Sequence, residues 1–148
     1  MTDQAQRLPP PHGRLIDRER VLAFTFEGRP YQGFDGDTIA SALAANGRWL
    51  MSRSFKYHRP RGPFSFWGHD ANAIVQIGAE PNVTADRRRL EDGMVVIPVN
   101  VNGSLRRDRG AWLAPFGRFL PVGFYYKAFY RPRGVWGLWE RVIRNRAG

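Results

Sequence analysis

The segment between residues 21 and 47 constrains the fold more than any other part of the chain. Apolar and polar residues alternate over Val21–Glu27, and this period of two predicts a half-buried strand whose apolar face is formed by Leu22, Phe24 and Phe26. A turn signal at residues 28–30 follows, and Tyr31–Phe34 is again extended. The chain is therefore expected to turn sharply and return as a second strand.

A short helix is predicted directly after the second strand. Asp37 or Thr38 provides its N-cap, apolar residues follow at helical spacing, and Asn46-Gly47 ends it. Further extended segments are predicted at residues 49–53, 73–77, 82–85 and 94–99. Strand, strand, helix and further strands is the order of a β-grasp, the ferredoxin-like sheet curled around one helix. We therefore expect an α+β fold, with this domain at residues 19–99.

Composition limits the chain to one domain with an ordinary core, because its 148 residues are 43% hydrophobic. The chain contains no cysteine, which excludes disulfides, thiolate catalysis and cysteine-ligated metal and favours a cytoplasmic location. No apolar run is long enough to span a membrane, and the N-terminus lacks the apolar core of a secretory signal. Residues 1–18, with three consecutive prolines, are expected to form a flexible, solvated arm.

The net charge of +10 is concentrated toward the C-terminus. Thirteen basic and eleven acidic residues occur up to Asn102, whereas ten basic and two acidic residues occur from Gly103 onward. Residues 100–148 are also rich in aromatic side chains, namely Trp112, Phe116, Phe119, Phe124, Tyr125, Tyr126, Phe129, Tyr130, Trp136 and Trp139. Because aromatic residues and arginine are enriched in buried interfaces, we expect an extended partner-docking segment here, with a short helix near its end.

The most unusual run in the chain is R-S-F-K-Y-H-R-P-R-G-P-F, from Arg53 to Phe64. It combines cationic, aromatic and turn-forming residues, a composition typical of loops that meet phosphates or acidic partner surfaces. The candidate binding residues are Arg53, Lys56, Arg59 and Arg61. Two alternatives remain open, a solvated surface loop and a set of ion pairs between the arginines and Asp70 or Asp86.

No catalytic or metal-binding residue is predicted from the sequence. His58 and His69 have no convergent partners at metal-ligand spacing. Ser65 has no local base and no nucleophile-elbow pattern around it, so nucleophilic catalysis is not expected.

The run R-S-F-K-Y-H-R-P-R-G resembles a signature of the α subunit of heterotetrameric sarcosine oxidases. Its P-R-G-P-F part is also similar to the stretch that opens the iron–sulfur loop in small subunits of amine, opine and hydrogen-cyanide-forming dehydrogenases. Two later stretches, L-P-V-G-F-Y-Y-K at residues 120–127 and V-W-G-L-W-E-R-V-I-R at residues 135–144, resemble the same α subunits. The resemblance runs from Ala23 to the end of the chain.

This resemblance implies where four cluster ligands would lie. In the iron–sulfur relatives, cysteines at C-x4-C-x2-C and a fourth after P-N-V-x-A hold a [2Fe–2S] cluster. The corresponding positions here are Ser65, Asp70, Ala73 and Asp86, none of which supplies a thiolate. The resemblance therefore implies a ferredoxin-like scaffold without a cluster, in which these are vestigial positions.

The resemblance also implies a function. It points to a non-catalytic small subunit of a hetero-oligomeric flavin-dependent amine oxidase or dehydrogenase, with FAD, FMN and NAD carried by partner subunits. The chain reaches Gly148 before any dinucleotide-binding glycine motif, which suggests a split subunit or a piece of a longer chain. The alternative is a basic, aromatic-rich nucleic-acid-binding module, suggested by a pI near 11.1. The nearly balanced charge of the predicted β-grasp disfavours that alternative.

Overall fold

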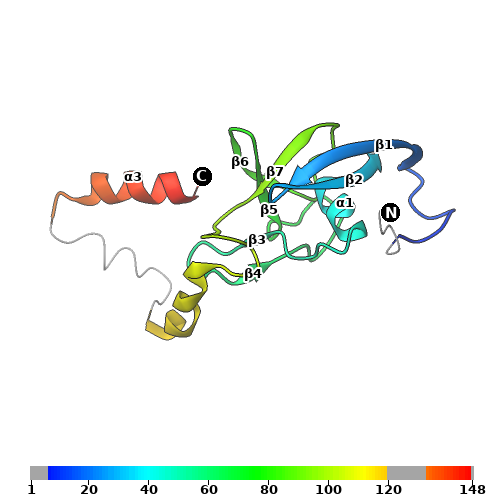
Figure 1. Cartoon of the computed structure of the whole chain (residues 1–148). Helices are drawn as coiled ribbons and strands as arrows, with labels where there is room; N and C mark the ends of the chain where they lie inside the picture. The colour runs from blue at the N-terminus through cyan, green and yellow to red at the C-terminus, as the bar shows by residue number, and fades with distance from the viewer. Residues whose placement is uncertain (1–6, 120–132, 148) are drawn as a thin grey trace.

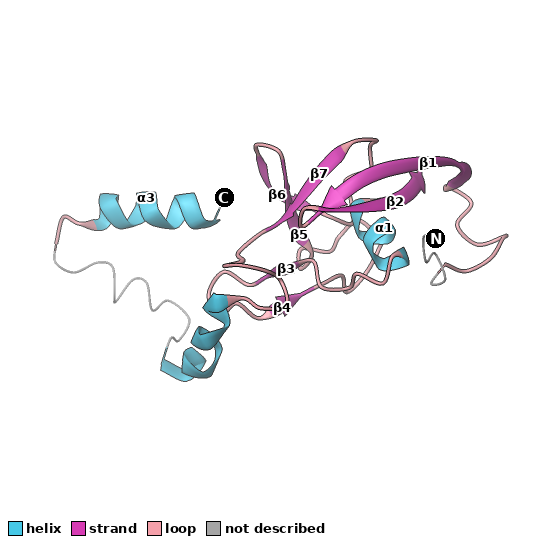
Figure 2. Ribbon diagram, in the orientation of Figure 1, coloured by secondary structure: helices cyan, strands magenta, loops and turns pink. Residues whose placement is uncertain are grey.

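The computed structural model of the protein describes residues 7–119 and 133–147. Its main element is a five-stranded mixed sheet of strand order β2-β1-β7-β5-β6 (Figures 1 and 2). The strands are β1 (Asp17–Phe26), β2 (Arg29–Asp35), β5 (Ile74–Ile77), β6 (Glu80–Thr84) and β7 (Met94–Pro98). β1 and β7 pair in parallel, whereas every other neighbouring pair in this sheet is antiparallel.

Helix α1 (Ile39–Ala45) packs against the sheet, and the core lies between them. Thr38 caps the helix, because its side chain accepts a hydrogen bond from Ser41 N while the Ser41 hydroxyl accepts one from Thr38 N. Helix and sheet approach closely at Gly33, where an added Cβ would lie 3.0 Å from Ala42 Cβ. The core contains Leu22, Phe24, Phe26, Ile39, Leu43, Met51, Val75, Leu90 and Val96.

This arrangement is consistent with the expected β-grasp, since one helix packs on a mixed sheet. The strands expected from the sequence are present with shifted bounds. β1 starts at Asp17 rather than Val21, because a bulge lets Asp17 pair with Asp35 beyond the regular register. The capped helix lies where the sequence predicts it.

β4 (Pro60–Arg61) and the 3₁₀ helix η1 (Arg109–Phe119) were not anticipated. β4 forms a separate antiparallel pair with β3 (Ser52–Arg53), which lies in the extended segment expected at residues 49–53. Helix α3 (Trp136–Ala147) is the short helix expected near the end of the chain. The aromatic residues Phe124, Tyr125, Tyr126, Phe129 and Tyr130 lie outside the described residues. No helix among the described residues is long and apolar enough to cross a membrane.

Arg7 attaches the N-terminal arm to the start of α1, and Arg18 of β1 donates to the carbonyl oxygens of Leu8 and His12 in the arm. Residues 8–15 are exposed, but the Arg7 side chain is only 10% exposed and pairs with Asp37, whose side chain is fully buried. Arg7 Nη1 donates to Asp37 Oδ1 at 3.0 Å, and its guanidinium lies 5.0 Å from the centre of the Phe34 ring. Asp37 also accepts hydrogen bonds from Phe34 N and the Ser41 hydroxyl. The arm therefore neutralises a buried carboxylate at the start of α1.

We expect Arg7→Ala to lower the free energy of unfolding by about 3 kcal/mol, because it leaves a buried carboxylate without its counter-charge. Denaturant unfolding of the purified chain measures this loss. Arg20→Ala is the matched control, since Arg20 pairs with Asp35 at the surface and its loss should cost less than about 1 kcal/mol. Equal and small losses in the two variants would contradict the role given to Arg7.

Candidate functional site

The cationic residues singled out in the sequence lie on residues 52–61, here called the basic hairpin. Hydrogen bonds between Ser54 and residues 58 and 59 join the two ends of its connecting loop. Ser54 N donates to Arg59 O at 2.9 Å, His58 N donates to Ser54 O at 2.9 Å, and Arg59 N donates to Ser54 Oγ at 3.0 Å. The loop therefore has a defined shape set by its own backbone.

Arg53 is the buried arginine that stabilises the basic hairpin. It is 8% exposed, and its Nη1 donates to His58 O at 2.8 Å. Its Nε donates to Leu105 O at 3.0 Å and lies 3.7 Å from Asp108 Oδ2. These partners satisfy the guanidinium inside the protein and tie the hairpin to the segment that follows β7.

His58 is held in a left-handed backbone conformation, with φ of 52°. Its Nδ1 lies 2.7 Å from Asp108 Oδ2, and Gly110 packs against its ring, because a Cβ there would fall 2.3 Å from the ring atoms. Burial by itself raises the pKa of Asp108. Hydrogen bonds from the backbone N–H of Asn102 and Gly110, together with the hydrogen bond and charge of His58, outweigh that effect and hold the pKa below its usual value.

The other three cations of the basic hairpin reach the surface at least in part. The Lys56 ammonium and the Arg59 guanidinium lie 4.8 Å and 4.7 Å from the centre of the Tyr57 ring, within cation–π range. Arg61 donates through Nη1 to the side-chain oxygen of Asn72. Arg59 is exposed, while Lys56 and Arg61 are half-buried.

Gly62 is required sterically where the basic hairpin ends. A Cβ at this position would lie 2.0 Å from the carbonyl oxygen of Trp49, so a larger residue would clash with backbone. The Gly62 carbonyl in turn accepts a hydrogen bond from the Asn72 side chain. The R-P-R-G motif thus encodes a close approach of two chain segments as well as positive charge.

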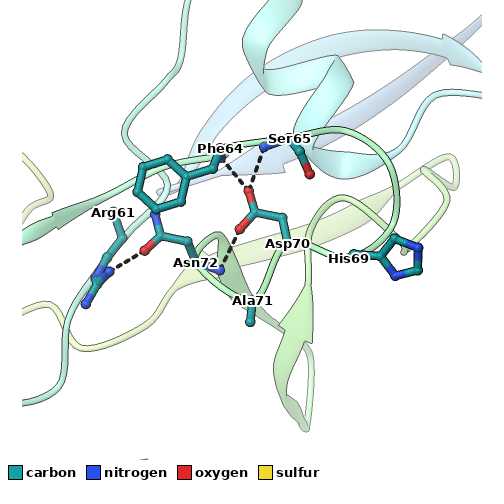
Figure 3. Close-up of a pocket in the computed structure, with 7 residues that line it drawn as sticks. All are labelled: Arg61, Phe64, Ser65, His69, Asp70, Ala71 and Asn72. Atoms are coloured by element: carbon teal, nitrogen blue, oxygen red, sulfur yellow. Dashed lines mark hydrogen bonds between the residues drawn. The ribbon is translucent and has the colours of Figure 1, made fainter.

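Residues 62–73, here called the 62–73 loop, are organised around the carboxylate of Asp70 (Figure 3). Asp70 Oδ2 accepts hydrogen bonds from Phe64 N and, at 3.1 Å, from Ser65 N, while Oδ1 accepts one from Asn72 N at 2.7 Å. Burial by itself raises the pKa of Asp70. The backbone N–H groups of Asn72, Ser65, Phe64 and Ala73 outweigh burial and lower the pKa below its usual value.

The structure brings the four implied ligand positions together. Ser65 N donates to the Asp70 carboxylate, Asp70 N donates to Asp86 Oδ2 at 2.8 Å, and Ala73 O accepts from Ala85 N at 2.9 Å. Asp70, Ala73 and Asp86 are buried. An open cavity of about 440 Å³ adjoins Ser65 and Asp70, and it is lined by Arg61, Phe64, Ser65, His69, Asp70, Ala71 and Asn72.

These residues do not fit a [2Fe–2S] cluster. Such a cluster needs four strongly donating ligands, normally thiolates, and the chain has no cysteine. Ala73 has no donor atom in its side chain, and both oxygens of Asp70 already accept hydrogen bonds from the backbone. Among the residues that the structure describes, no group of three or more His, Asp or Glu side chains could hold a metal ion.

The alternative in which arginines fill the site with ion pairs is not what the structure has. Within the described residues, neither Arg59 nor Arg61 forms an ion pair with Asp70 or Asp86. Backbone N–H groups donate to both oxygens of Asp70 and to Oδ2 of Asp86 instead.

The outer side of the 62–73 loop is aromatic. Phe64 and Trp67 are each 86% exposed, and Phe66 and Trp49 are about half exposed, with their rings 6.3 Å apart in an edge contact. Large apolar groups that gather at a surface are typical of sites covered by another molecule. This aromatic surface adjoins Arg61 of the basic hairpin.

Comparison with known proteins places the chain in a family. The family described as the 2Fe-2S iron-sulfur cluster binding domain matches residues 19–100, more than half of the chain. The chain belongs to that family.

The chain is also similar to particular members of one enzyme group. It is 48% identical over 143 residues to sarcosine oxidase subunit alpha of Rhizobium meliloti (strain 1021), covering 93% of this chain and 14% of the relative. The same subunit of Corynebacterium sp. (strain P-1) is 35% identical over 95 residues, covering 64% of this chain and 10% of the relative. The resemblance to sarcosine oxidase α subunits is thereby confirmed, and the chain spans only a small part of their length.

One solved structure, L-proline dehydrogenase from P. horikoshii, matches with 24% identity and a TM-score of 0.48. The match covers 55% of this chain and 16% of that chain.

Two residues that shape the site were missed in the sequence. Asn72 joins the 62–73 loop to the basic hairpin, and Asp108 joins the hairpin to the segment before η1. Asp108 is one of only two acidic residues after Asn102, and this isolation among basic residues was a usable signal. Asn72 has no comparable signal, because its partners are set by the fold.

We expect the purified protein to show no iron–sulfur absorbance, because Ser65, Asp70, Ala73 and Asp86 stand at all four ligand positions. Visible spectroscopy with iron and sulfide analysis of anaerobically isolated protein checks this. Stoichiometric iron and sulfide would refute it.

We expect Gly110→Ala to displace the His58 ring and to destabilise the protein by about 1–3 kcal/mol, the usual cost of forcing a methyl group into a filled space. The His58 ring resonances in NMR spectra and the unfolding midpoint measure the two effects. Gly137→Ala is the control, because nothing lies within 4 Å of a Cβ at that position. Unchanged His58 resonances in Gly110→Ala would argue against the packing described.

Proposed function

We propose that this chain is a non-catalytic part of a multi-subunit flavin-dependent amine oxidase or dehydrogenase of the sarcosine oxidase type, which demethylates N-methyl amines oxidatively. The supporting observation is the 48% identity to a sarcosine oxidase α subunit over 93% of the chain. In this proposal the partner subunits carry FAD, FMN and NAD, and this chain structures the interface next to them.

The side chains of the site support a structural rather than a chemical role. The buried acids Asp70 and Asp108 accept hydrogen bonds from the backbone, and His58 is paired with Asp108. No redox ligand is available at the former cluster positions, because the chain has no cysteine. A site of this kind holds its own loops in place and has no group poised to transfer electrons.

The partner contact in this proposal is made by the basic hairpin and the aromatic surface beside it. Arg59, Arg61 and Lys56 bind a flavin or dinucleotide phosphate, or an acidic patch beside it, while the buried Arg53 keeps the hairpin in shape. Phe64 and Trp67 supply apolar area that loses its exposure on contact. Together these groups match a partner surface that is acidic and apolar.

We expect the double substitution Arg59→Ala/Arg61→Ala to weaken assembly with the flavin-bearing subunits roughly ten-fold for each arginine, since each lost charge-assisted hydrogen bond contributes more than about 1.4 kcal/mol. Co-expression with those subunits, followed by affinity and flavin-content measurements on the complex, tests this.

Two controls sharpen the experiment. Arg59→Lys/Arg61→Lys keeps the charge but loses the planar fork, so its complex should be intermediate if phosphate or carboxylate is recognised. Arg20→Ala removes one exposed charge from the β1–β2 hairpin and should leave assembly unchanged. An intact complex with full flavin occupancy in the double-alanine variant would refute the contact. Retention on heparin at high salt without any flavoprotein association would favour nucleic-acid binding instead.

A further inference from the structure

The backbone of the 62–73 loop directs several N–H groups inward to one point. Phe64 N, Ser65 N and Asn72 N all donate to the Asp70 carboxylate, and Ala73 N contributes to the same group (Figure 3). A buried N–H without an acceptor costs about 1–3 kcal/mol, so these converging donors need an acceptor at the centre of the loop. In a protein that holds an iron–sulfur cluster, hydrogen bonds to the cluster sulfurs meet that need.

The carboxylate is satisfied as an acceptor rather than poised as a ligand. Asp70 uses both oxygens for backbone donors and sits over Asp86, whose Oδ2 accepts from Asp70 N at 2.8 Å. The described residues also offer no third acidic or imidazole group for a metal ion at this point. The arrangement is therefore that of an internal anion enclosed by N–H donors.

We propose that the Asp70 carboxylate takes the place of the iron–sulfur cluster as the anion around which the 62–73 loop folds. Asp86 supports it through the Asp70 N–H. The proposal rests on the family membership and on the hydrogen bonds, and it stands whether or not the chain joins a flavin-dependent complex.

This internal anion has a consequence for the surface. Asn72 N is anchored on Asp70 Oδ1, and the Asn72 side chain contacts both Arg61 and Gly62. Asp70 is thus a positioning residue for Arg61, because it fixes the asparagine that holds the arginine. The loop can in this way hold the Arg61 side chain in one orientation without a bound metal.

The test is amide hydrogen exchange followed by NMR on the full chain in buffer that contains a chelator. The Phe64, Ser65 and Asn72 amides should be protected in the wild-type protein. In Asp70→Asn, which keeps the shape but loses the charge, their exchange should accelerate by ten-fold or more. The backbone N–H of Ala23 is the internal reference, because it donates to Asp92, which lies outside the 62–73 loop.

Asp35→Asn is the matched control variant, since Asp35 is a partly exposed acid whose partner is the surface residue Arg20. It should leave exchange in the 62–73 loop unchanged. Asp86→Asn should produce a smaller acceleration than Asp70→Asn, because Asp86 accepts from Asp70 N and not from the Phe64, Ser65 or Asn72 amides. The Arg61 side-chain resonances should broaden or shift in Asp70→Asn and stay unchanged in Asp35→Asn.

Two results would overturn the proposal. The first is equal exchange at Phe64, Ser65 and Asn72 in wild type and Asp70→Asn. The second is a rise in the wild-type unfolding temperature, with new visible absorbance, when ferrous iron, sulfide and a thiol are added anaerobically. If Asp70→Asn does not fold, the wild-type measurement decides, because unprotected loop amides in chelator refute an internal anion. None of these outcomes depends on flavin subunits, so failure of the proposed function stays distinguishable.

Discussion

The parallel pairing of β1 with β7 is the constraint on which the candidate site depends. Parallel strands leave a sheet at the same edge, so residues that follow Phe26 and residues that follow Pro98 emerge side by side. Glu27 there accepts a hydrogen bond from Leu105 N at 2.7 Å, which directs the segment after β7 across the basic hairpin. Arg53 and Asp108, far apart in sequence, come into contact only because of this edge.

Buried carboxylates organise three different parts of this strongly basic chain. Asp37 pairs with Arg7 and accepts a hydrogen bond from Phe34 N just before α1. Asp70 accepts hydrogen bonds from backbone amides of the 62–73 loop. Asp108 accepts hydrogen bonds from the backbone amides of Asn102 and Gly110. A carboxylate surrounded by N–H donors is stable when buried, because the donors replace the water it loses. These parts of the small domain are therefore shaped from inside by buried carboxylates.

A buried carboxylate that accepts hydrogen bonds from loop amides explains how a chain without cysteine can belong to an iron–sulfur family. The chain matches this family over residues 19–100, and within that range the Asp70 carboxylate satisfies the amide donors of the 62–73 loop. The evidence for a role in a flavin-dependent complex comes from the similarity to sarcosine oxidase α subunits, of which the chain spans 14% in the relative from Rhizobium meliloti.

The sequence by itself determined the β1–β2 hairpin, the capped helix α1 and the cationic run, because each follows from residues adjacent in the chain. The four cluster-ligand positions were implied by the family resemblance alone. Only the tertiary structure decided that Arg53 is buried and hydrogen-bonded to Leu105 O, and that Arg61 donates to Asn72. It also decided that Asp70 accepts hydrogen bonds from the loop amides. Hydrophobic period, caps and motifs are local signals. Burial and hydrogen-bond partners across dozens of residues depend on which strands become neighbours, and no local pattern encodes that.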